Sequence, residues 1–245
     1  MDFIKTTEQL RKVNGELDTF TYNVTHNLRS PLATIKGLVN LSRSEKHLDM
    51  ETFHRYFDLI NQNIIKLDQS LSEIVDFSTN ARSEIVYEQV DLEWIYKNSM
   101  ESLASLKLYG RCEKHFSIES SAIAVCDHAR LVVLFRNMLA NCINFQKEND
   151  TKSFIHTHVQ VTSKMIQIEF TDNGIGIHKN SLPNLFSMFY RGTEKSKGAG
   201  LGLYITKNIV EKLQGTITVS SSEQTGSTFV VTLPNIPLPK NAELN

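Results

Sequence analysis

Apolar residues recur at spacings of three, four and seven over two long stretches at the start of this sequence. The first stretch runs from roughly residue 6 to residue 43, and the second from about residue 50 to residue 80. This spacing places the apolar side chains on one face of an α-helix. The seam of the second stretch consists of Phe57, Ile60, Ile64, Leu67, Leu71 and Ile74. We expect two long amphipathic helices, the first with a local kink at Pro31, because proline removes a backbone donor.

The two helices are expected to form an antiparallel hairpin, because only the short polar stretch at residues 44–49 separates them. A lone hairpin cannot cover both apolar seams. Two copies paired into a four-helix bundle would cover them, so residues 1–81 are predicted to be an all-α hairpin that forms a homodimer. The alternative is a hairpin that packs against its own second domain.

The pattern changes after Asn80, where helical and strand-like segments begin to alternate. Strands are expected at residues 116–119, 154–162, 165–171, 216–220 and 228–233, and helices at residues 92–108, 130–145 and 201–213. This order predicts an α+β domain over residues 85–235, in which helices cover an open sheet. Residues 236–245 are rich in proline and polar side chains and are expected to be a loose tail.

Charge and cysteine content exclude several classes of protein. The 26 basic and 27 acidic residues leave a formal charge of -1, so no global field attracts nucleic acid or an anionic membrane. Three cysteines without a CxxC pair argue against a disulfide framework and a structural zinc site. No apolar run approaches the ~20 residues that cross a bilayer. We expect a soluble, cytoplasmic chain, either as it stands or as the cytoplasmic part of a longer membrane-bound sensor.

Four short motifs in the second region favour nucleotide binding. Asn137 and Asn141 are four residues apart, so both amides share one helix face, and an amide oxygen suits Mg²⁺. Residues 172–177, DNGIGI, follow a strand and combine a carboxylate for an adenine amino group with glycines that allow close backbone approach. Residues 198–203, GAGLGL, open a helix whose first amides attract phosphate. Residues 226–229, GSTF, enter the last strand. Each motif alone has an ordinary alternative, such as a cap or a turn.

Taken in order, the four motifs resemble the nucleotide-binding fold shared by histidine kinases, gyrase-type and chaperone ATPases and mismatch-repair ATPases. The resemblance implies an α+β sandwich that binds ATP with Mg²⁺, in which Asn141 holds the metal and Asp172 binds the adenine amino group. The other residues that it implies at the nucleotide are Asn137, Asn144, Phe145, Gly174, Gly176, Ile177, Gly198, Gly200, Leu201, Gly202, Leu203 and Thr228. Phe189 and Arg191 resemble a phenylalanine-containing segment of the kinases, and core packing is the alternative for Phe189.

The first helix carries the segment FTYNVTHNLRSPL, residues 20–32, which resembles the phospho-accepting histidine region of these kinases. His26 is its central residue, and Asn27, Arg29 and Ser30 are expected beside it. A neutral imidazole nitrogen is nucleophilic near pH 7. The resemblance implies the catalytic core of a sensor histidine kinase of two-component signal transduction. Such a core phosphorylates its own histidine from ATP and passes the phosphoryl group to an aspartate of a response regulator receiver domain.

Several positions depart from the kinase pattern. Asn27 stands where many relatives carry Glu or Asp, and an amide orients an imidazole but cannot accept its proton. Ser30 replaces the Thr or Asn of relatives that also dephosphorylate their partner, and Asn144 replaces a basic residue. A degenerate kinase that acts as a nucleotide-binding dimeric scaffold is therefore an open alternative. A water-using ATPase is a second one, disfavoured because Asn137 occupies the position of its glutamate base.

Overall fold

The computed structural model describes residues 2–44, 49–147, 152–192 and 199–236, without the side chains of residues 2–19. The chain forms two compact units. One comprises the residues up to Val75 together with residues 199–201, and the other comprises the remaining residues from Asp76 onward. The first unit is helical, and the second contains the sheet.

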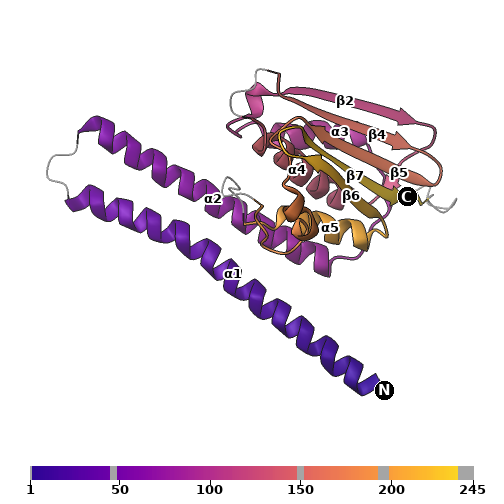
Figure 1. Cartoon of the computed structure of the whole chain (residues 1–245), viewed down its shortest axis with the longest axis horizontal. Helices are drawn as coiled ribbons and strands as arrows, with labels where there is room; N and C mark the ends of the chain where they lie inside the picture. Colours follow the sequence, from indigo (N-terminus) through magenta and orange to yellow (C-terminus); the bar gives the residue numbers. More distant parts are fainter. Residues whose placement is uncertain (1, 45–48, 148–151, 193–198, 237–245) are drawn as a thin grey trace, which may run out of the picture. The chain divides into compact units, whose positions relative to one another are not determined.

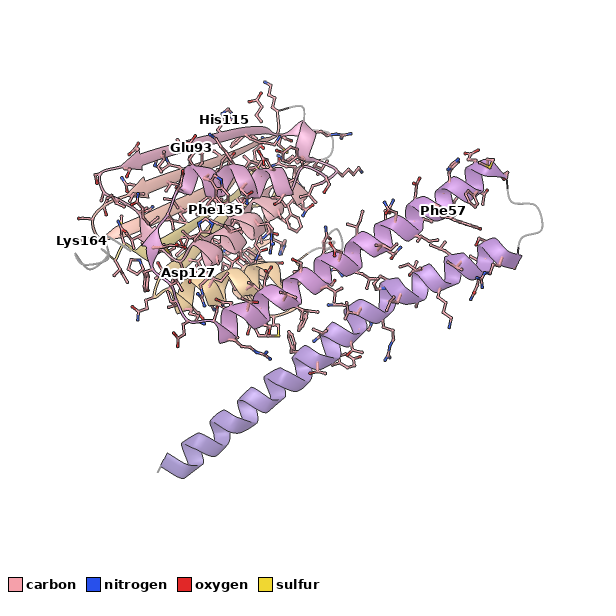
Figure 2. All side chains as sticks on the ribbon, turned by 180° about the vertical axis from the view of Figure 1, so that it is seen from behind. Phe57, Glu93, His115, Asp127, Phe135 and Lys164 are labelled. Carbon is pink, nitrogen blue, oxygen red and sulfur yellow. The ribbon has the colours of Figure 1, made fainter. Side chains whose placement is uncertain are left out.

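The hairpin consists of helices α1 (Asp2–Ser44) and α2 (Met50–Arg82), which run antiparallel and side by side in both views (Figures 1 and 2). The two predicted helices are confirmed, and α1 continues through Pro31 without ending. Asp49 caps the start of α2, because its carboxylate accepts from the backbone N–H of Thr52 at 2.6 Å. In the described part of the chain, no helix is long and apolar enough to cross a membrane.

Only half of the apolar seam of α2 is covered within one chain. The half-buried members are Ile60, Leu67 and Ile74, and the uncovered members are Phe57, Ile64 and Leu71, at 54%, 51% and 51% exposed. Each set repeats every seven residues, so the uncovered set forms a stripe along the helix. Large apolar side chains in such a stripe mark a candidate interaction surface.

The second unit is built on a five-stranded sheet with the order β2-β4-β5-β7-β6. Its strands are β2 (Glu113–Ser120), β4 (Phe154–Val161), β5 (Met165–Asp172), β6 (Thr216–Ser222) and β7 (Gly226–Pro234). Strands β2 and β4 are parallel, and the other neighbours are antiparallel. A separate two-stranded pair joins β1 (Glu88–Gln89) to β3 (Val125–Cys126).

Three helices cover one face of this sheet (Figure 1): α3 (Leu92–Ser102), α4 (His128–Asn144) and α5 (Gly202–Lys212). Side chains alternate along β4 and β5 between buried and half-exposed, as expected when one face is covered. The ring of Phe135 on α4 meets that of Phe170 on β5 at 5.3 Å between centroids, and Figure 2 labels Phe135 between helices and sheet. The predicted α+β arrangement is confirmed.

The helix predicted at residues 92–108 is wrong in its second half. Helix α3 ends at Ser102, and the chain continues in turns to the 3₁₀ helix η1 (Tyr109–Arg111). Backbone bonds there join residues three apart, as from Leu106 N to Leu103 O at 3.0 Å. Apolar residues at a spacing of three are compatible with both geometries, so periodicity did not separate them. The short strand β3 and the 3₁₀ helix η2 (Lys179–Asn184) were not predicted either.

Candidate functional site

One face of α4 connects two of the sequence motifs. Asn137, Asn141 and the capping residue Phe145 are spaced by four and therefore share a face. At one end, the side-chain amide of Asn137 donates to the carbonyl oxygen of Gly202, the first residue of α5, at 3.3 Å. At the other end, the carbonyl oxygen of Phe145 accepts from the N–H of Ile175 at 2.9 Å. The asparagines thus lie between the start of α5 and the glycine loop that follows β5.

Asp172 ends β5 with its side chain buried. The N–H of Gly174 donates to its Oδ1 at 2.8 Å. Burial raises the pKa of this carboxyl to about 6, although the backbone N–H groups of Gly174 and Ser227 and the nearby Lys147 oppose the shift. A carboxylate held away from water is a strong and selective acceptor, because an unpaired donor or acceptor there would be costly.

The loop after Asp172 tolerates only glycine at two positions. A Cβ atom on Gly174 would lie 2.3 Å from the carbonyl oxygen of Phe145, and one on Gly176 would lie 2.0 Å from that of Ser222. Gly176 also has a φ of 69°, which L side chains rarely adopt. The N–H of Ile177 donates to the hydroxyl of Ser221 at 2.9 Å. Through these contacts the loop packs tightly against the end of α4 and against β6.

Strand register separates Thr228 from Asp172. Asp172 pairs with Ser227 across β5 and β7, and both side chains are buried. Because side chains alternate along a strand, Thr228 lies on the face that the helices do not cover, where its hydroxyl bonds to Thr171 at 3.0 Å. The sequence motif singled out Thr228 and missed Ser227, whose hydroxyl lies 2.9 Å from that of Ser221. Strand alternation inward from the buried Phe229 is the signal that identifies Ser227.

The donor set of the site fits ATP with a magnesium ion. The Nδ2 atom of Asn141 is buried and has no hydrogen-bond partner among the described residues. Within those residues, no three His, Cys, Asp or Glu side chains gather in a way that could hold a metal ion. The Nδ2 atom of Asn141 is a donor and suits a phosphate oxygen, whereas a metal at Asn141 would be held by the amide oxygen together with phosphate oxygens, as Mg²⁺ prefers. Asn144 lies on an exposed side of α4.

The predicted nucleotide residues later in the chain lie between η2 and the first turn of α5. Gly198 is outside the described residues; Gly200 has a φ of 78°, Leu201 is buried and Leu203 is half-buried. Phe189 has a φ of 61°, an unusual conformation for a bulky residue and one that concentrates at functional sites. Arg191 is exposed. None of these residues forms the hydrogen bonds around Asp172 described above, which come from Gly174, Ser221 and Ser227.

His26 lies on α1 with an exposed side chain, and Arg29 and Ser30, three and four residues later, share its exposed face. The ring of Tyr22, one turn earlier, stacks beside the imidazole at 6.5 Å between centroids and an interplanar angle of 21°. Asn27 is half-buried. The imidazole is therefore accessible to a large substrate.

Two family descriptions match this chain. Residues 16–82 match the His Kinase A phospho-acceptor domain, and residues 126–237 match the histidine kinase-, DNA gyrase B- and HSP90-like ATPase domain. Both domains occur here in the order of a kinase core. The chain belongs to the histidine kinases. This family assignment confirms the resemblance of both motif sets, because each match contains the corresponding residues, His26 in the first and Asp172 in the second.

Similar kinases are known by sequence and by structure. The methanogenesis regulatory histidine kinase FilI of Methanothrix harundinacea is 29% identical over 226 residues, or 90% of this chain. The chain spans 25% of the length of FilI. The structure of histidine kinase ThkA in complex with the response regulator TrrA has a TM-score of 0.68 at 22% identity. It covers 92% of this chain and 64% of ThkA. ShkA in complex with AMPPNP has a TM-score of 0.60 at 20% identity, covering 93% and 45%. These structures show the same fold.

Proposed function

We propose that this histidine kinase transfers the γ-phosphoryl group of ATP to His26 and then to an aspartate of a response regulator, in the cytoplasm. The observation that carries the proposal is the coexistence of two sites in one chain. Helix α1 exposes His26 within its phospho-acceptor segment, and the second unit holds the buried Asp172 within an ATPase domain. A nucleotide-binding domain alone would not require an exposed acceptor histidine.

The nucleotide is expected to bind along the face of α4. Asp172 would accept from the adenine amino group, with Gly174 and Gly176 giving the base room beside the loop. The GAGLGL segment, with Gly200, Gly202 and the first amides of α5, suits the phosphates. We propose Ser227 in place of Thr228 as the β7 residue on the nucleotide side, because Ser227 pairs with Asp172. The roles of Phe189 and Arg191 stay predictions from the family resemblance.

Phosphoryl transfer breaks the bond between the γ-phosphorus and the bridging oxygen, and forms a bond from that phosphorus to an imidazole nitrogen of His26, with ADP leaving. Mg²⁺, held by Asn141 and the phosphates, supplies charge stabilisation when bound. The attacking nitrogen must be unprotonated, so the proton sits on the other ring nitrogen and must leave to a base as the phosphorus–nitrogen bond forms, which keeps the ring neutral. Asn27 can orient the ring but cannot take this proton, so we expect slower labelling than in relatives with a carboxylate there.

Two partners follow from the hairpin. A second copy of this chain would cover the stripe formed by Phe57, Ile64 and Leu71, which gives a dimeric four-helix bundle. The solved complex of ThkA contains the response regulator TrrA. By that likeness, we propose that a receiver domain docks on the bundle beside His26 and takes the phosphoryl group on an aspartate.

Labelling tests the proposal. Purified protein is incubated with Mg²⁺ and γ-labelled ATP, beside His26→Gln and the matched control His54→Gln, which changes another exposed helical histidine. We expect acid-labile, alkali-stable label on the wild type and on His54→Gln, and none on His26→Gln. Nucleotide binding without label would favour the scaffold alternative, and steady phosphate release without label would favour a water-using ATPase.

A further inference from the structure

The last turns of α2 belong to the ATP-binding unit, which begins at Asp76, although α2 itself begins in the hairpin. The carboxylate of Asp76 forms an ion pair with Arg136 of α4. The ring of Phe77 lies 6.0 Å from that of Tyr204 on α5, measured between centroids. The end of α2 is therefore packed against both α4 and α5.

Arg130, in the first turn of α4, binds the C-terminus of α2 with its whole guanidinium group. Its side chain is only 5% exposed. Nε donates to Oδ1 of Asn80 at 2.9 Å, Nη2 to the carbonyl oxygen of Ser83 at 2.7 Å, and Nη1 to that of Glu84 at 3.1 Å. The last carbonyl groups of a helix lack partners within the helix and carry the negative end of its dipole. A cation placed at this helix end donates hydrogen bonds to the carbonyl groups and lies next to the negative end of the dipole.

A second cation reaches the same helix end from the last turn of α5. The Nζ atom of Lys212 donates to the carbonyl oxygens of Asn80, Ala81 and Ser83. The bond to Ser83 measures 2.8 Å. Side chains from two separate helices thus converge on the carbonyl oxygens of Asn80, in the last turn of α2, and of Ser83, the residue that follows the helix.

Asp127 completes the arrangement and extends it past the end of α2. Figure 2 labels this residue at the start of α4, where Oδ1 accepts from the backbone N–H of Arg130 at 2.9 Å. Its Oδ2 forms a buried ion pair with the Arg130 guanidinium and accepts from the N–H of Val86 at 3.1 Å. We call Asp127, Arg130 and Lys212 the α2 clamp. Through these three residues, positions 80–86 are bound to α4 and α5.

We propose that Arg130 is a positioning residue for phosphoryl transfer, because the α2 clamp makes the end of α2 and the ATP-binding unit move as one body. The inference rests on the proposed function, since α2 is the covalent path from the His26 hairpin to the nucleotide. A transfer in line requires the reacting atoms within about 3–3.5 Å, and small misplacements are costly. Without the clamp, residues 80–86 become a loose tether, and the nucleotide samples many positions relative to the imidazole.

The test compares Arg130→Met and Lys212→Met with the control Arg82→Met, which removes an exposed guanidinium from the same helix end. The readouts are the dissociation constant of a fluorescent ATP analogue and the initial rate of His26 labelling at saturating ATP. We expect Arg130→Met to label about 10–100-fold more slowly, because the loss lies in positioning. Lys212→Met should show a smaller loss in the same direction. All three variants should bind nucleotide like the wild type.

Backbone amide hydrogen exchange tests the α2 clamp by a measurement that does not depend on kinase activity. The amides of Ser83 and Val86 donate to Thr79 O and to Asp127, respectively, and should be protected in the wild type. In Arg130→Met we expect their exchange to accelerate about tenfold or more, which corresponds to losing roughly one buried charged hydrogen bond. If Arg130→Met shows no cooperative melting, the half-exposed Lys212 provides the same comparison at lower cost to folding.

Two results would overturn the inference: unchanged exchange at Ser83 and Val86 in both clamp variants, or labelling of the variants at the wild-type rate or faster. Different measurements on the wild type distinguish failure of the proposed function from failure of the clamp. A wild type that takes up no label contradicts histidine kinase activity, whereas rapid exchange at Ser83 and Val86 in the wild type contradicts the clamp.

Discussion

Asp172 and Ser227 are register partners on β5 and β7, and both residues are buried. The hydroxyl of Ser227 bonds in turn to that of Ser221, which accepts from the N–H of Ile177. The carboxylate and the glycine loop are thus linked through two serines. Thr228, the next residue, lies on the other face of the sheet.

The adjacent residues Ser227 and Thr228 therefore provide a matched pair of substitutions. Ser227→Ala removes the bond to Ser221 and should weaken nucleotide binding by about fivefold, the equivalent of one neutral hydrogen bond of about 1 kcal/mol. Thr228→Ala removes a bond on the helix-free face and should leave the affinity unchanged. Titration with a fluorescent ATP analogue measures both. The opposite ranking would place Thr228 at the nucleotide.

Nucleotide affinity should fall in acid through the titration of Asp172. The pKa of this carboxyl is about 6 in the nucleotide-free protein. Below that pH its proton faces the adenine amino group, which is also a donor, so affinity should fall about tenfold per pH unit. Dissociation constants measured from pH 8 to pH 5 test this, with Asp172→Asn as the control for titration of the phosphates. Equal slopes in the two proteins would contradict the role of Asp172.

The same raised pKa predicts that the ionised, buried carboxylate of Asp172 lowers the stability of the nucleotide-free protein. Between pH ~4 and pH ~6 the folded protein binds a proton that the unfolded chain does not, so stability declines as pH rises through this window. Asp172→Asn keeps an acceptor for Gly174 and removes the buried charge. We expect its unfolding free energy at pH 7 to rise on the order of 1–3 kcal/mol. Urea denaturation at pH 7 and pH 4 measures the difference, which should shrink at the lower pH.

Gly174→Ala should damage both stability and nucleotide binding. Its Cβ atom would meet the Phe145 carbonyl oxygen at 2.3 Å, and backbone on both sides must shift. We expect a loss of about 1–3 kcal/mol in unfolding free energy. Gly192→Ala is the control, because the nearest atoms to its Cβ lie 3.8 Å away. Similar melting temperatures for the two variants would contradict the tight packing of the loop.

Ile64→Asp should dissociate the proposed dimer. Ile64 is the central member of the uncovered stripe on α2, and a charge there would be buried against the second copy. Light scattering at micromolar protein should give a dimer for the wild type and a monomer for the variant. Lys66→Asp places the same charge on an exposed neighbouring position and should stay dimeric. A monomeric wild type would favour coverage of the stripe by another part of the protein.

Local patterns in the sequence determined the helices of the hairpin and the residues of the motifs. The seven-residue repeat through Phe57, Ile64 and Leu71 predicts a long helix with an apolar stripe, because helix periodicity depends only on neighbours along the chain. The glycines of the DNGIGI loop were recognised for the same reason, since close backbone approach requires them wherever the loop lies. The order of the motifs then indicated the α+β fold.

Tertiary structure alone decided which of these residues meet. Ser227 rather than Thr228 faces Asp172 because the register of β5 and β7 sets the face, and a shift of one residue would reverse it. Arg130 binds Asn80, 50 positions earlier, and Lys212 binds the same helix end from α5. Nothing in the sequence around Arg130 distinguishes it from a solvated helix residue. Its burial and its partners arise only when α2, α4 and α5 pack together, because contacts between distant segments depend on the whole fold.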